Sequence, residues 1–226
     1  MSEADRAPRG RRATVVLAVL VLAGAAVFAG LSALRPDRPG TGGPEAGFAR
    51  DMSTHHAQAV RMSFTVRDRT KDEATRLLAY DIINTQSAQI GMMTAWLDEW
   101  ELPKTDPAGR MRWMTGHGGH GSAATPAPAA TDGAAGTAGA DGAVMPGMAT
   151  RTQLRELEQA SGRAAEIRYL RLMITHHRAG VVMAEAVLAR TDLERVRRLA
   201  RSMVDGQRSE IDLMNRMLGE RGAGAG

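Results

Sequence analysis

Two segments of this sequence bring methionine and histidine together at the spacing of an α-helix. The first reads Met-Ser-Thr-His-His over residues 52–56, the second reads Met-Ile-Thr-His-His over residues 173–177, and in each a further methionine follows six residues after the second histidine. On a helix these four side chains fall within an arc of about 120°, so each segment predicts one face with two thioethers and two imidazoles. The candidate site residues are Met52, His55, His56, Met62, Met173, His176, His177 and Met183.

Thioether and imidazole are soft ligands. Together they suit a thiophilic metal, Cu(I) above all, better than Mg²⁺, Ca²⁺ or an iron ion held by carboxylates. The chain has no cysteine, so a soft-metal site must be built from Met and His alone. The same residues allow a second interpretation, in which the methionines are core side chains and the histidines are held by structural hydrogen bonds. From these residues alone, both interpretations stay open.

The two segments belong to an internal duplication. An offset of 121 residues aligns them without a gap and continues through two successive helical patterns in each copy. Residue spacing predicts helices over 47–66, 71–100 and 163–189, a fourth that ends near 218, and a short helix over 150–160. Two duplicated αα-hairpins can bury their apolar faces against each other as a four-helix bundle. The matched pairs include Thr70 with Thr191, Glu73 with Glu194, Gln86 with Gln207, Met93 with Met214 and Leu97 with Leu218.

The second helix of each hairpin begins after a short turn with the same sequence form in both copies. Thr70-Lys-Asp-Glu73 and Thr191-Asp-Leu-Glu194 both match the capping box, in which the threonine side chain accepts from an amide of the first turn and the glutamate reaches back. We therefore expect Thr70 and Thr191 to cap these helices.

The apolar stripe of each second helix also contains polar residues. A buried amide or carboxylate must find a partner, and the imidazoles of the facing helix are the obvious ones. Such a bond would either orient a metal-bound histidine or hold a structural one. A ferritin-type di-iron site needs several inward glutamates, and only Glu210 is available, so iron is disfavoured, as is a zinc site without cysteine. The stripe residues concerned are Gln86, Gln89 and Met93 in the first copy and Gln207, Glu210 and Met214 in the second.

The N-terminal part has the pattern of a membrane anchor. Four arginines precede an uncharged, mostly apolar run that is about long enough to span a bilayer. With the arginines on the cytoplasmic side, the rest of the chain is predicted to be extracytoplasmic, as a single-pass membrane protein or as a secreted one if the segment is cleaved. The predicted parts are a basic tail over 1–12, a transmembrane signal anchor over 13–34, a linker over 35–46, a first hairpin over 47–101, a flexible Gly- and Ala-rich linker over 102–148 and a second hairpin over 149–220.

Other classes of protein are disfavoured by composition. The net charge of +4 comes from arginines interleaved with acidic residues, and only 4% of the residues are aromatic, so no nucleic-acid surface is indicated. No nucleophile and base or carboxylate pair can be placed, so the chain is not predicted to be an enzyme. The other two histidines, His117 and His120, lie in the linker near Met111 and Met114. They either form a flexible metal-capturing arm or are incidental.

These motifs resemble those of a known family, domain of unknown function 305. The resemblance rests on the doubled Met-x-x-His-His, the facing Gln-x-x-Glu-Ile-x-x-Met helix and Met-Pro-Gly-Met at 145–148, and it covers 47–100 and 145–218. It implies an all-α, ferritin-like four-helix bundle, usually extracytoplasmic, with copper binding and a role in copper tolerance in some members.

Carried onto this chain, the resemblance implies that the eight methionines and histidines of the two faces are the metal ligands. It also implies that Met145 and Met148 approach the second half of the site. Gln89 stands where the family motif has glutamate, whereas Glu210 keeps it. Unequal binding by the two halves is therefore a hypothesis from the sequence.

Overall fold

The computed structural model describes residues 38–106, 108–115, 142 and 144–224, preceded by the isolated positions 17, 20, 21 and 23. The chain divides into two units, Met1–Arg38 and Pro39–Gly226, and the helices described below all belong to the second. Most of the predicted membrane anchor lies outside the described residues, and so do His117 and His120. Among the residues that are described, no helix combines the length and apolar character needed to cross a bilayer.

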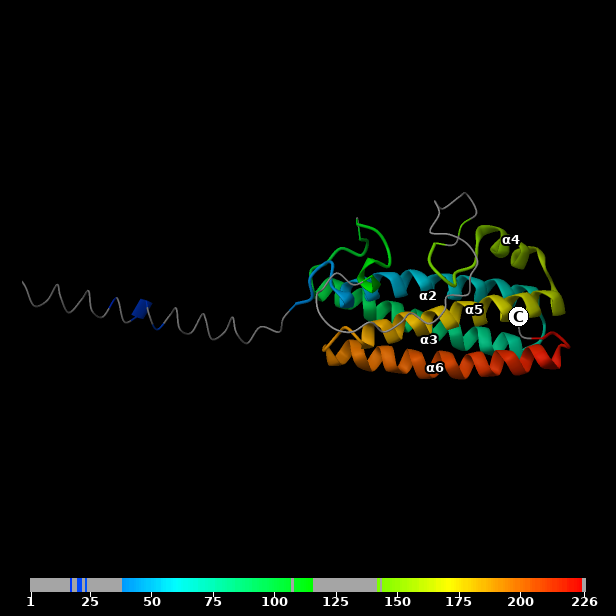
Figure 1. The fold of residues 1–226 in the computed structure, drawn as a ribbon. Helices are drawn as coiled ribbons and strands as arrows, with labels where there is room; N and C mark the ends of the chain where they lie inside the picture. The colour runs from blue at the N-terminus through cyan, green and yellow to red at the C-terminus, as the bar shows by residue number, and fades with distance from the viewer. Residues whose placement is uncertain are drawn as a thin grey trace, which may run out of the picture. The chain divides into compact units, whose positions relative to one another are not determined.

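The second unit is all-α throughout its described part, with four long helices side by side and a short fifth one (Figure 1). Each of the five predicted helices is present and begins and ends within three residues of its predicted bounds. The elements are α2 (Pro44–Arg69), α3 (Glu73–Glu99), the 3-10 turn η2 (Arg112–Met114), α4 (Arg151–Gln159), α5 (Gly162–Leu188) and α6 (Glu194–Glu220).

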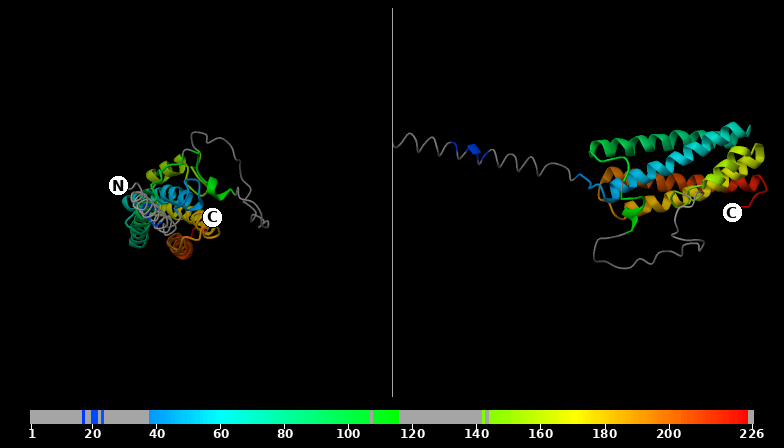
Figure 2. Two further views of the ribbon diagram at one scale, coloured as in Figure 1. Left: turned by 90° about the vertical axis from the view of Figure 1, so that its left-hand side faces the viewer. Right: turned by 90° about the horizontal axis from the view of Figure 1, so that it is seen from above.

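The helices form the two hairpins that the duplication predicts. α2 packs along α3, α5 packs along α6, and the hairpins meet where α2 packs against α5 in antiparallel orientation (Figure 1). α3 and α6, in contrast, do not pack closely against each other. α4 contacts α2 and α5, and the view along the helix axes in Figure 2 shows it on their side remote from α3 and α6. The two histidine-bearing helices are therefore the inner pair.

The predicted capping boxes at Thr70 and Thr191 are wrong. Asp72 is the N-cap of α3 and accepts from the amide of Thr75, while Leu193 holds the N-cap position of α6 without a side-chain bond. Each threonine hydroxyl instead accepts from the amide two residues further on, at 3.0 Å for Thr70 and 3.1 Å for Thr191. This local bond places both threonines in the turn before the helix.

A capping box does form at the start of α4. The hydroxyl of Thr150 accepts from the amide of Gln153 at 3.2 Å, and the side chain of Gln153 accepts from the amide of Thr150 at 2.8 Å. The pair satisfies two backbone donors that the helix itself leaves open. It gives this short helix a defined beginning beside α2 and α5.

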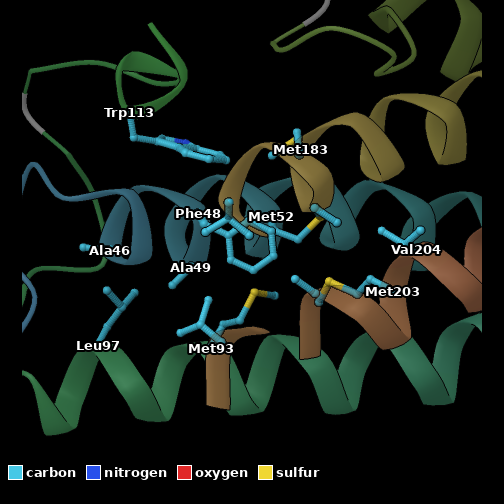
Figure 3. Packing of buried hydrophobic residues seen from close by; sticks show 14 of the residues in the cluster. Ala46, Phe48, Ala49, Met52, Met93, Leu97, Trp113, Met183, Met203 and Val204 are labelled. Atoms are coloured by element: carbon cyan, nitrogen blue, oxygen red, sulfur yellow. The ribbon is translucent and has the colours of Figure 1, made fainter. Parts of the chain in front are cut away.

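Two apolar clusters fill the space between the helices. One contains Phe48 and Met52 from α2 with Leu97 from α3, and it extends to α5 and α6 (Figure 3). The other contains Met62 from α2 with Tyr169 from α5, and it also extends to α3 and α6. Since the histidine pairs lie between these residues along α2 and α5, the clusters occupy the two ends of the helices and the histidines lie between them.

Residues 108–115 pack on α2 although they fall within the predicted linker. Trp113 is buried, its ring meets Phe48 edge to face, and its indole nitrogen donates to the carboxylate of Asp51 at 2.9 Å. Gly47 is required beneath it, because a Cβ at this position would lie 2.3 Å from the indole ring. The other end of the linker is fixed as well, since the side chain of Gln58 makes two hydrogen bonds to the backbone of Ala149.

Candidate metal centre

The four histidines of the duplicated motif meet where α2 and α5 pack together. All four are buried, with at most 1% of any of them exposed. The rings of His55 and His176 lie against each other, with centroids 3.6 Å apart and planes tilted by 31°. These two residues are equivalent in the duplication. The approximate symmetry axis that relates the two hairpins therefore passes between their rings. The sequence predicted the residues but not this contact.

The other histidine of each pair is bonded to the second helix of its own hairpin. Nε2 of His56 lies 2.7 Å from the amide oxygen of Gln89, and Nε2 of His177 lies 2.7 Å from a carboxylate oxygen of Glu210. An oxygen of this kind accepts, so each Nε2 carries the proton and donates. Nδ1 of both rings is left as a lone pair, and neither Nδ1 has a hydrogen-bond partner. Metal-binding histidines are commonly oriented in this way by an acceptor on the far nitrogen.

The inner pair is less well satisfied. His176 donates from Nε2 to the backbone carbonyl of His55 at 3.0 Å, whereas neither ring nitrogen of His55 has a partner. Leaving a buried polar atom without a partner costs about 1–3 kcal/mol. In the described part of the chain, six of the eight buried side-chain atoms without a partner lie in this one region, namely Nδ1 and Nε2 of His55, Nδ1 of His56 and His177, and Oε1 of Gln86 and Gln207.

Burial keeps three of the imidazoles, those of His55, His56 and His176, neutral. Loss of hydration lowers the pKa of His55 to about 3, and repulsion from His56 and His177 acts in the same direction. Burial likewise lowers the pKa of His56 to about 3, although the bond to Gln89 opposes this. The pKa of His176 lies well below its usual value, first because of burial and then because of the neighbouring histidines. Neutral rings offer a lone pair to a metal ion with no proton to displace.

The methionines of the two faces pair between the hairpins. Met52 shares its apolar cluster with Met183, and Met62 shares the other cluster with Met173. Ten residues of helix separate Met52 from Met62, which is about 15 Å along the axis and too far for one ion to bind both. The sequence groups the four residues of each face together, whereas the antiparallel packing of α2 and α5 divides each face between two ends.

Further methionines surround each pair. Met93 from α3 and Met203 from α6 join Met52 and Met183 at one end, as Figure 3 shows. Met214 and Met217 from α6 join the pair at the other end. The sequence predicted Met93 and Met214 but not Met203 and Met217. Their equivalents in the first copy are Ile82 and Trp96, so the duplication gave no signal for them.

The remaining candidates take positions beside the centre. Gln86 and Gln207 are buried, while Gln89 and Glu210 are partly exposed at the edge of the histidine cluster. Met145 and Met148 are buried in the loop before α4. No group of three or more His, Cys, Asp or Glu suited to a metal occurs among the described residues. The donor set of imidazoles and thioethers, with unpartnered ring nitrogens, fits a soft metal and not a hard one.

Comparison with known proteins identifies the family. Residues 45–218 match the family model described as domain of unknown function, DUF305. The match covers most of the chain, including both hairpins and all four buried histidines. The protein belongs to the DUF305 family, as its motifs suggested. No protein with curated information gives a significant match.

Solved structures of related proteins share the fold. A DUF305 protein from Streptomyces coelicolor, described as a predicted secreted protein, is 45% identical, covers 83% of this chain and 99% of its own, and has a TM-score of 0.69. A DUF305 fragment from Deinococcus radiodurans is 30% identical, covers 78% and 96%, and has a TM-score of 0.58. CopM in its Cu(I)-bound form is 20% identical over 78% of this chain and 96% of its own, with a TM-score of 0.54.

Proposed function

We propose that this protein binds copper, chiefly as Cu(I), in the centre formed by the four buried histidines and the methionines at its two ends. The observation that carries the proposal is the set of unpartnered imidazole nitrogens at duplicated positions, two of them on rings oriented by an acceptor at Nε2. Thioethers from both hairpins lie at either end of this set. The distant relative CopM has been solved with Cu(I), Cu(II) and silver, of which Cu(I) and silver share the preference for soft ligands such as thioethers.

The role that suits this site is storage or carriage of copper and not catalysis. The histidines are buried, and the side chains bonded to their rings are one amide, from Gln89, and one carboxylate, from Glu210. The family relation supports the ferritin-like description of the bundle. The apolar segment at 13–34 would place the protein outside the cytoplasm, either anchored to the membrane or released, and the description of the Streptomyces relative agrees with export.

The alternative is a helical scaffold whose histidines are purely structural. The bonds from His56 to Gln89 and from His177 to Glu210 favour it, since each would hold a helix pair together without a metal. The unpartnered atoms weigh against it, because a structural network is expected to satisfy the polar groups that it buries. The two functions predict different responses to copper.

A competition measurement tests the proposal. The full-length protein, reduced and free of oxygen, is titrated against a chromophoric Cu(I) chelator, and we expect it to withdraw the metal. Replacing His55→Ala together with His176→Ala is expected to abolish this. The matched control is Thr54→Ala together with Thr175→Ala, because these neighbouring threonines bond only to carbonyls of their own helices. Unchanged copper affinity in the histidine variant, or a melting temperature of the wild type that does not respond to copper, would support the scaffold instead.

A further inference from the structure

The two halves of the centre differ in one charge. His56 and His177 occupy equivalent positions, and each donates from Nε2 to an oxygen 2.7 Å away, but the acceptor is the neutral amide of Gln89 in one half and the carboxylate of Glu210 in the other. The bond lengths are the same, so the halves differ in electrostatics and not in the geometry of this contact. We propose, on the basis of the copper-binding function above, that Glu210 makes His177 a stronger metal ligand than His56, so that the metal binds at His177 first.

The exposure of the side chains also supports a role for Glu210 in metal binding. α4 and the loop before it cover the side of α2 and α5 remote from α3 and α6 (Figure 2). On the opposite side, α3 and α6 do not pack closely, and the side chain of Glu210 is 25% exposed while that of His177 is fully buried. Of this bonded pair, the carboxylate of Glu210 is therefore the group that an ion in solvent can reach. A partly exposed negative charge beside a buried ligand attracts cations and raises their rate of association.

A second departure from the duplication falls in the same half. Gly180 on α5 is equivalent to Ala59 on α2, and a Cβ at Gly180 would lie 2.3 Å from Oε1 of Gln207. The missing methyl group lets the buried amide of Gln207 lie against α5, one helical turn before Glu210. Both of these departures from the duplication thus fall in the α5–α6 half.

The carboxylate acts through His177 and not by contact with the reacting lone pair. Glu210 fixes the tautomer, makes the imidazole a stronger donor to a metal, and offsets the charge of the ion that binds at Nδ1. Gln89 fixes the tautomer of His56 but supplies no charge. Glu210 is therefore a positioning residue whose effect is electrostatic. Gln89, at the equivalent position of the first copy, is its neutral counterpart.

The test exchanges the two acceptors. Cu(I) affinity is measured by chelator competition on the full-length protein for Glu210→Gln and Gln89→Glu. We expect Glu210→Gln to weaken binding about tenfold or more, since loss of such a partner typically costs 10–100-fold. We expect Gln89→Glu to strengthen it. Glu185→Gln is the control, because it removes the same charge from an exposed pair with Arg208.

The order of occupancy is read from the histidine ring signals by nuclear magnetic resonance during titration with Cu(I). His177 signals are expected to change before those of His56 in the wild type, and the order should be lost in Glu210→Gln. An affinity that is the same in Glu210→Gln and the wild type, or earlier changes at His56, would overturn the inference while leaving copper binding intact. A wild-type protein that takes no Cu(I) from the chelator would instead overturn the proposed function itself.

Discussion

At the scale of single residues, what matters is which atoms the neighbours leave free. Residue types and spacing singled out two pairs of histidines but not their contact, because adjacent histidines on a helix with methionines before and after them are rare enough to stand out. They could not show that Nε2 of His56 and His177 would be hydrogen-bonded while Nδ1 has no partner. This depends on where the side chains of Gln89 and Glu210 lie on the facing helices. The chemistry of the centre follows from this second fact.

A prediction at the same scale concerns two glycines that both lie against a side chain. Gly47→Ala would bring a Cβ within 2.3 Å of the rigid indole of Trp113, and Gly180→Ala would bring one equally close to Oε1 of Gln207. The indole must leave its place on Phe48, whereas an unpartnered amide oxygen at the end of a flexible side chain can move. We expect Gly47→Ala to lower the free energy of unfolding by about 2–4 kcal/mol, since loss of a buried Trp side chain costs about 3–5 kcal/mol and alanine in a helix returns about 1 kcal/mol.

Gly180→Ala is the matched case and should change the free energy of unfolding by less than about 1 kcal/mol, because helix propensity offsets the adjustment of Gln207. Urea unfolding of both variants provides the measurement, and a red shift of tryptophan fluorescence in Gly47→Ala would report the release of Trp113. Equal stability of Gly47→Ala and the wild type would show that residues 108–115 are not held by this contact.

At the scale of the helices, the sequence predicted what depends on periodicity and missed what depends on contacts between distant segments. All five helices follow from apolar spacing. The N-caps of α3 and α6 do not, because Thr70 and Thr191 can bond either to the first turn of a helix or to the amide two residues on. The hydrogen-bond network at the end of α6 could not be predicted from the sequence either. It involves Arg221, which lies outside the aligned repeat and has Trp100 at the equivalent place.

Arg221 joins three parts of the chain, and its removal should be costly. Its guanidinium donates to Glu166 at the start of α5, to Asp72 and Thr75 at the start of α3, and to the carbonyl of Met217. The side chains of Arg221 and Glu166 are each only 9% exposed. Arg221→Ala leaves a buried carboxylate without its cation, and we expect a loss of about 3 kcal/mol in unfolding free energy.

Two controls separate the buried charge from general loss of an arginine. Arg208→Ala, in an exposed pair with Glu185, should cost less than about 1 kcal/mol. Adding Glu166→Gln to Arg221→Ala should recover part of the stability, because the amide is less costly to bury than an unpaired carboxylate. Denaturant unfolding of the three variants measures both effects. No recovery in the double variant would mean that Arg221 acts mainly through Asp72 and the backbone.

At the scale of the whole molecule, the antiparallel contact of α2 with α5 changes what the duplication means. Two copies of one hairpin suggest two copies of one site, each within its own hairpin. The structure instead places equivalent histidines ring against ring and groups Met52 with Met183 and Met62 with Met173. Neither hairpin alone contains either methionine pair. Any metal bound by these side chains would therefore connect the two hairpins, and its binding would add to the stability of the fold by mass action.

A double-mutant cycle on Cu(I) affinity distinguishes these two arrangements. Met→Leu removes the thioether while nearly conserving volume, so the core should tolerate it at a cost below about 1.5 kcal/mol. If each site spans both hairpins, Met52→Leu and Met183→Leu remove ligands from the same ion, and their effects on binding should be non-additive by about 0.5–3 kcal/mol. Met52→Leu and Met62→Leu, on one helix but at opposite ends of the centre, should add within about 0.5 kcal/mol. The reverse result, with coupling between Met52 and Met62 only, would indicate that each metal site lies within a single hairpin. It would contradict the pairing of methionines across α2 and α5.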